Sequence, residues 1–60
     1  MPGINKWEKV RDVAINYRRE HKRRLYKSFN VRDILAVSEE SGAGINTALQ
    51  SILVLSVIND

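Results

Sequence analysis

Apolar side chains recur at steps of three and four residues through the first half of the chain, which is the spacing of one face of a helix. The residues that keep this spacing are Trp7, Val10, Ala14, Tyr17, His21 and Leu25. Basic side chains lie on the opposite side of the same helix. We therefore expect one helix from about Asn5 or Lys6 to Lys27, anchored in the core by Trp7, whose large aromatic surface is costly to leave in water.

A second helix has a clear start signal at Asn30, whose side chain suits the capping of free backbone N–H groups. Asp33 lies three positions further on, where a carboxylate favours the helix dipole. Phe29 can pack onto Ile34 across this start. The sequence predicts a short helix from Val31 to about Glu39. Its inward-facing residues are expected to be Val31, Ile34, Leu35 and Val37.

A turn must follow at Ser41–Gly44, the only strong helix-breaking segment after Pro2. A third segment begins near Ile45 or Asn46 and again keeps helical spacing. The residues on its apolar side are Ile45, Ala48, Leu49, Ile52, Leu53 and Leu55 or Ser56. Its other side is polar and uncharged, which predicts a helix with one buried face.

The polar side of this third segment disappears after Ser51. A helix that is apolar all round has to be covered all round, which one small domain achieves with difficulty. We therefore expect an oligomer interface here, in a two-fold dimer, formed by Leu53, Val54, Leu55, Val57 and Ile58. The β-branched side chains in this stretch leave an alternative open, in which the last five or so residues form a strand that pairs between chains.

The length of 60 residues fits one small helical domain over residues 1–60. Without cysteine the chain can form neither a disulfide nor a thiolate metal site, and without clustered ligands we expect no metal and no cofactor. Apolar runs reach no more than four residues, as in Ile52–Leu55, which is far shorter than the roughly 20 residues that cross a bilayer. The start, Met1–Gly3, leads straight into charged residues and lacks the apolar stretch of a signal peptide. We expect a soluble cytoplasmic protein that is stabilised by helix packing and self-association.

Positive charge is concentrated in one segment, Arg18–Lys27. It holds six of the ten basic residues and one of the seven acids, a net charge of +5 with His21 neutral. Residues 28–60 hold one Arg and four acids, a net charge of −3. Such segregation favours a polyanionic partner. On one helix, the side chains that would meet a row of phosphates are Arg18, Arg19, Lys22, Arg23 and Lys27.

The second half of the chain has the layout of a helix-turn-helix unit, with a short helix, a tight glycine-containing turn and a second helix. The segments Phe29–Leu35 and Ile45–Ile52, followed by the pair Val57–Ile58, resemble the core of winged-helix and helix-turn-helix DNA-binding domains. The resemblance covers about half of the chain, from Phe29 to Ile58. It departs from that pattern in having no wing before Asp60 and no Lys or Arg in the second helix.

The resemblance implies a role for each side of this pair of helices. The first helix would be anchored by Val31, Ile34 and Leu35, and the recognition helix would bury Ile45, Leu49 and Ile52. The exposed polar residues of the recognition helix are Asn46, Thr47 and Gln50, and Asn and Gln are types that pair with adenine edges. The expected fold is all-α with three helices, in which the long basic N-terminal helix packs on a helix-turn-helix-like pair.

The function expected from these patterns is not enzymatic. His21 stands alone on the apolar stripe, where a packed histidine is the ordinary case, and no nucleophile, base and acid occur together. We expect a small nucleic-acid-binding protein, for DNA rather than RNA, that acts as a homodimeric transcriptional regulator. The alternative is an interaction module whose basic helix docks an acidic protein. A membrane surface is disfavoured because Trp7 lies far along the chain from the basic segment.

Overall fold

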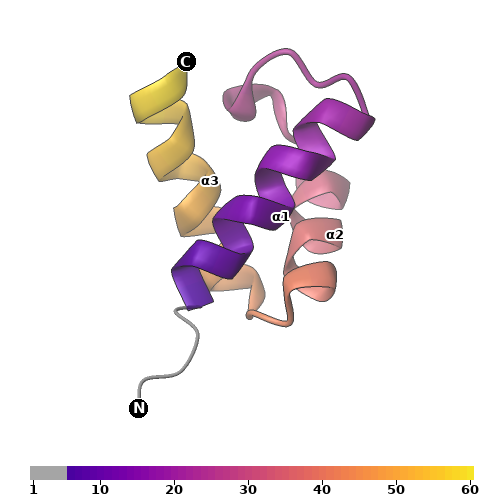
Figure 1. The fold of residues 1–60 in the computed structure, drawn as a ribbon, viewed down its shortest axis with the longest axis vertical. Helices are drawn as coiled ribbons and strands as arrows, with labels where there is room; N and C mark the ends of the chain where they lie inside the picture. The colour runs from indigo at the N-terminus through magenta and orange to yellow at the C-terminus, as the bar shows by residue number, and fades with distance from the viewer. Residues whose placement is uncertain (1–5) are drawn as a thin grey trace.

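Three α-helices and one short 3-10 helix make up residues 6–60, the part of the chain that the structure describes (Figure 1). In this computed structural model α1 spans Lys6–Glu20, η1 spans Tyr26–Ser28, α2 spans Val31–Ser41 and α3 spans Ile45–Asn59. Residues 6–60 contain no strand, so the expected all-α class is confirmed. The alternative of a C-terminal strand is wrong, because α3 stays helical to Asn59. The expected helix start at Asn5 lies outside the described residues.

The start of α2 is fixed by a reciprocal cap. The Asn30 side chain accepts a hydrogen bond from the backbone N–H of Asp33 at 2.9 Å, and the Asp33 carboxylate accepts one from the backbone N–H of Asn30 at 2.9 Å. Two N–H groups that the helix cannot satisfy internally are thereby bonded. The predicted start of this helix is confirmed, and its end at Ser41 lies two residues beyond the expected Glu39.

The predicted turn between α2 and α3 is also confirmed. Gly42 has a φ of 77°, in the left-handed region that glycine enters without strain, and its N–H bonds the Ser38 carbonyl at 3.0 Å. The Ser38 hydroxyl donates to the Ala43 carbonyl at 2.8 Å, which ties the turn back to the helix. The chain direction changes by 113° between α2 and α3.

The core forms where α1 lies across both α2 and α3 (Figure 1). Its buried apolar residues are Val10, Ala14, Tyr26, Phe29, Val37, Ala43, Ala48, Ile52 and Leu55. The first helix contributes only Val10 and Ala14 to this group, so it buries only a narrow strip. Removing this area from water supplies the main driving force for folding.

The narrow strip explains which inward-facing residues the sequence predicted wrongly. Trp7 is 45% exposed, and α1 is anchored by Val10 and Ala14 instead. Helical spacing marks the apolar side but not its width, and a domain this small covers only the centre of that side. The apolar residues expected inside but found exposed are Val31, Leu35, Ile45, Leu49 and Leu53.

The first helix ends seven residues before the expected Lys27, and the continuous basic helix is therefore wrong. After Glu20 the N–H of Lys22 bonds the Arg19 carbonyl at 3.3 Å, and the N–H of Arg23 bonds the Arg18 carbonyl at 2.9 Å. This is the hydrogen-bond pattern of a Schellman motif. Lys22 occupies its left-handed position with a φ of 55°, where glycine is usual. The turn redirects the chain so that η1 packs against α3.

Candidate nucleic-acid interface

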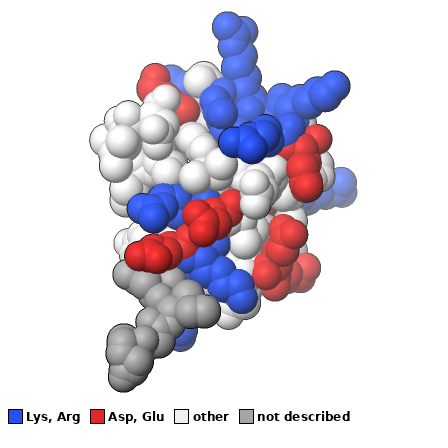
Figure 2. All heavy atoms as spheres, viewed as in Figure 1, with Lys and Arg blue, Asp and Glu red and all other residues white. Residues whose placement is uncertain are grey.

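The turn after α1 converts the basic segment into a corner of the molecule. Figure 2 shows Lys and Arg side chains gathered over the end of α1 and the loop that follows it. We call the four exposed cations of this segment the basic corner: Arg19, Lys22, Arg24 and Lys27. Basic groups at a helix C-terminus also interact favourably with the negative end of the helix dipole.

Two of the predicted phosphate ligands are engaged within the fold. Arg23 pairs with Asp33, and Arg18 donates to the backbone carbonyl of Arg24 while its guanidinium carbon lies 4.8 Å above the centre of the Tyr26 ring. The sequence placed both arginines on one helical face with Arg19, Lys22 and Lys27. The structure instead separates two partly buried arginines from the basic corner.

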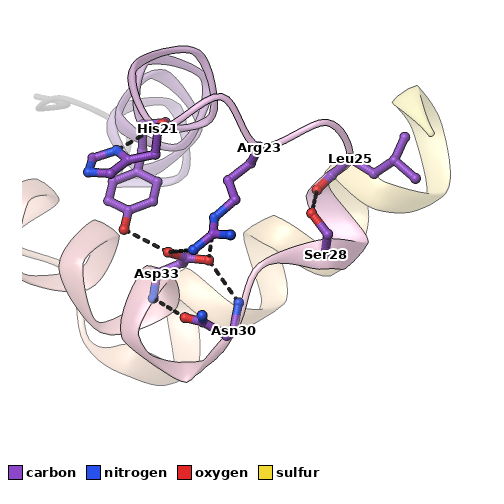
Figure 3. A network of polar contacts seen from close by, with 7 residues as sticks. His21, Arg23, Leu25, Ser28, Asn30 and Asp33 are labelled. Atoms are coloured by element: carbon purple, nitrogen blue, oxygen red, sulfur yellow. Dashed lines mark hydrogen bonds and ion pairs between the residues drawn. The ribbon is translucent and has the colours of Figure 1, made fainter.

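Asp33 is the centre of a polar network that joins α1, the loop and α2 (Figure 3). Its carboxylate accepts from the Tyr17 hydroxyl at 2.7 Å, from Arg23 Nη2 at 3.1 Å and from the Asn30 backbone at 2.9 Å. Arg23 Nε lies 3.0 Å from the other carboxylate oxygen, a close ion-pair contact without hydrogen-bond alignment. Asp33 is only 1% exposed, so these partners replace the water that it loses.

The network sets the protonation of its own members. Burial raises the pKa of Asp33, but the hydrogen bonds from Tyr17, Asn30 and Arg23 and the charge of Arg23 outweigh it, so the pKa lies below its usual value. The hydrogen bond that Tyr17 donates to this carboxylate raises the pKa of Tyr17, and burial and the negative charge of Asp33 add to that rise. Both groups are therefore held in the forms that bond each other.

His21 lies beside the basic corner and is exposed. Its ring stacks on Tyr17 with centroids 3.9 Å apart and planes at 15°, and its Nδ1 lies 3.2 Å from the Tyr17 carbonyl oxygen (Figure 3). The sequence predicted a packed histidine; it is exposed because it follows the last residue of α1. Tyr26, the other aromatic residue in the basic segment, is 5% exposed and belongs to the core.

The polar residues expected to read bases lie elsewhere. Asn46 and Gln50 are exposed and Thr47 is half-buried, all in the first two turns of α3. Figure 1 places the start of α3 at the opposite end of the long axis from the end of α1. The structure therefore does not bring these three residues together with the basic corner.

The apolar side of α3 that faces away from the core is exposed. The exposed fractions are 55% for Leu53, 48% for Val54, 83% for Val57 and 70% for Ile58. Leu55, expected at the same oligomer interface, is 5% exposed and packs in the core of its own chain. Its position on the helix turns it toward Ala48 and Ile52, so it cannot also face a partner.

Residues 6–60 contain no group of three His, Cys, Asp or Glu side chains that could hold a metal ion. Within the same residues no single helix is long and apolar enough to cross a membrane; α2 and α3 reach that length and hydropathy only as a pair, across their 113° bend. No match to this chain is found among protein-family models, curated proteins or solved structures.

Proposed function

We propose that this protein is a non-enzymatic nucleic-acid-binding protein that engages phosphates through the basic corner. The observation that carries the proposal is the gathering of four exposed cations over the end of α1 and the segment that follows it, while Arg23 is neutralised by Asp33. Within residues 18–27 the one acid is Glu20. Clustered cations of this kind bind a polyanion by releasing its condensed counterions.

The strained backbone of Lys22 supports this proposal. A non-glycine residue in the left-handed region costs about 1–2 kcal/mol, and such strain concentrates at functional positions. Glycine would relieve the strain but would remove a cation from the basic corner. A positive charge needed for binding would explain why a lysine is kept here in spite of the free-energy cost of its backbone conformation.

Binding through the basic corner has a defined dependence on salt. Neutralising four phosphates gives a slope of log affinity against log salt of about −3.6 on duplex DNA and about −2.8 on a single strand. Contacts to phosphates do not distinguish one base sequence from another. The proposed function therefore uses the basic corner alone and includes no sequence recognition. The 113° bend between α2 and α3 suits a helix-turn-helix unit, but base reading at the start of α3 would use the opposite end of the molecule.

The test is a titration of fluorescent DNA and RNA at several salt concentrations, with the paired change Arg19→Gln and Lys22→Gln. The matched control is Lys9→Gln with Arg11→Gln, two exposed cations in the first half of α1. The first pair should weaken binding and should reduce the slope of log affinity against log salt by the amount expected for about two phosphate contacts. The control pair should change binding much less.

Three results would contradict the proposal. The first is an absence of binding at low salt, and the second is an equal loss in both variant pairs. The third is equally tight binding of polyglutamate, which would favour the alternative of an acidic protein partner. Circular dichroism of each variant tests whether the helices remain.

We also propose that a second copy of the chain covers the exposed apolar side of α3. Its four exposed residues are uncharged, so two copies can meet there without the repulsion expected between chains of net charge +3. The backbone N–H of Lys27 bonds the Asp60 carboxylate at 2.9 Å, which fixes the end of α3 beside η1. A dimer through α3 would bring two basic corners to one polyanion and raise its affinity.

Sedimentation over a range of concentrations tests the dimer. The parent should associate, and Leu53→Gln with Val57→Gln should give folded monomers, because both side chains are mostly exposed in the single chain. A parent that stays monomeric at high concentration would contradict this proposal without affecting the basic corner.

A further inference from the structure

An exposed aromatic stack lies at the edge of the basic corner. Tyr17 covers one face of the His21 ring, at 3.9 Å between centroids, and yet His21 is exposed. With Tyr17 on one face, the other face and the edge are the parts of the imidazole that a ligand can reach. A flat ring face open to solvent is a surface on which another planar group can stack.

Contacts of Tyr17 with the rest of the fold hold the stack of Tyr17 and His21 in place. The Tyr17 hydroxyl donates to Asp33 at 2.7 Å, and the Tyr17 ring packs on buried Phe29 with centroids 5.6 Å apart. His21 Nδ1 lies 3.2 Å from the Tyr17 carbonyl oxygen, and because a carbonyl only accepts, this contact is a hydrogen bond in the tautomer that has its proton on Nδ1. A ring that is already fixed loses little conformational freedom when a ligand stacks on it.

The surroundings of the open face match one class of ligand. Lys22 follows His21 directly, and its left-handed backbone begins the loop that carries Arg24 and leads to Lys27 in η1. Cations beside an open aromatic face are the arrangement by which proteins hold single-stranded nucleic acid, with phosphates on the cations and a base on the ring. In a duplex the faces of the bases are covered by the neighbouring base pairs, so bases along the length of a duplex cannot stack on the His21 ring.

Other aromatic residues do not offer this combination. Of the aromatic residues in 6–60, only Trp7 and His21 are exposed, and Trp7 lies 14 residues earlier, about 21 Å away along a helix. Tyr26 lies in the core under Arg18. His21 is therefore the one open ring beside the basic corner in the part of the chain that the structure describes.

We infer that the basic corner takes single-stranded nucleic acid, with one unpaired base stacked on the outer face of His21. This inference rests on the proposed function and narrows its ligand from any nucleic acid to one with accessible bases. Because stacking accepts any base, the expected preference is for single strands over duplexes rather than for a sequence.

The experiment compares two fluorescent strands of 12 nucleotides, oligothymidine and an abasic strand with the same phosphates, together with a duplex of equal length. Stacking of one base is worth about 1–3 kcal/mol, so the parent should bind oligothymidine about 5- to 150-fold more tightly than the abasic strand. His21→Ala and His21→Gln should lose this preference and keep their affinity for the abasic strand, while His21→Trp should retain it.

An independent readout comes from the parent protein itself. Ring protons of His21 should shift upfield in NMR spectra when oligothymidine is added, and should shift much less with the abasic strand. This measurement does not depend on whether a variant folds.

The outcomes separate this inference from the proposed function. Equal binding of both strands by the parent, or a preference that survives in His21→Ala and His21→Gln, would overturn the stacking of a base and leave phosphate binding in place. Binding of none of the nucleic acids would remove both.

Discussion

Replacing Asp33 is the most direct test of how this small domain is held together. Its carboxylate is 1% exposed and joins α1 to α2 through Tyr17, to the loop through Arg23, and to its own helix start through Asn30. Asp33→Ala removes all of these bonds at once. Asp33→Asn keeps the shape and one acceptor oxygen but loses the negative charge.

The expected loss follows from the surroundings of each partner. A hydrogen bond to a charged group contributes about 1.5–3 kcal/mol, and a helix cap about 1 kcal/mol. The Arg23 side chain is 37% exposed, so its unpaired charge returns to water and its share is that of a surface pair, about 0–1 kcal/mol. Asp33→Ala should therefore lower the free energy of unfolding by about 3–4 kcal/mol, and Asp33→Asn by about half as much. A domain of 60 residues has a total of only about 3–9 kcal/mol, so the alanine variant should be near unfolding.

Urea unfolding followed by circular dichroism measures these losses. Asp12→Ala is the matched control, because Asp12 is an exposed acid on α1 and should change stability by no more than about 0.5 kcal/mol. A double-mutant cycle between Tyr17→Phe and Asp33→Asn should give a coupling of about 0.5–3 kcal/mol. If Asp33→Ala is as stable as the control, the cost of burying the carboxylate cancels its bonds, and the network does not stabilise the fold.

Three further predictions concern pH and backbone strain. The pKa of Asp33 is lowered in the fold, so its stabilising effect is complete above the ordinary value of 3.8 and is lost as the pH falls through the folded value; the acid-induced loss of stability should be shallower in Asp33→Asn. The pKa of Tyr17 is raised above 10.0, so its contribution is complete below that pH and is lost as the pH rises through the folded value; unfolding titrations should show a shallower loss in alkali for Tyr17→Phe. Lys22→Gly should raise the free energy of unfolding by about 1 kcal/mol and Gly42→Ala should lower it by about 1 kcal/mol, because φ is positive at both positions. Gly44→Ala is the control, because Gly44 has a φ of −68°, and it should change the free energy of unfolding in urea titrations by only a few tenths of a kcal/mol. An equal loss of stability at the two glycines would exclude backbone strain as the cause.

Local signals in the sequence predicted the start of α2 and the turn after it, because residues close in the chain make both features. Asn30 and Asp33 are three positions apart and cap each other, and Gly42 can enter the left-handed region. These features need no knowledge of the rest of the fold. The confirmed all-α class follows from the same local rules, applied to a chain without proline after Pro2.

The end of α1 could not be predicted in the same way. No glycine, proline or asparagine occurs from Arg18 to Lys27, and the stop is made by Lys22 in a conformation that lysine rarely adopts. The turn is compensated by distant contacts, among them Tyr17 to Asp33 across 16 positions. Tertiary contacts of this kind override local helix preference.

The candidate site was predictable as a segment but not as a surface. Charge counting finds Arg18–Lys27, yet it does not show that Arg23 is paired with Asp33 or that Arg18 covers Tyr26. The exposure of His21 also depends on where the helix stops. Sequence periodicity placed it on the apolar stripe, and only the turn after Glu20 brings it to the edge of the basic corner.

The hydrogen bond from the Lys27 backbone to Asp60 has a practical consequence for spectroscopy. It holds the last turn of α3 beside η1, so a fluorophore attached at the exposed Asn59 would sit near the basic corner and leave the Asp60 carboxylate bonded. A fluorophore at residue 6 would sit at the start of α1, toward the other end of the long axis. With the same dye in each place, the quenching that a bound strand causes at one end and not at the other would map where the strand lies without altering His21 or any residue of the basic corner.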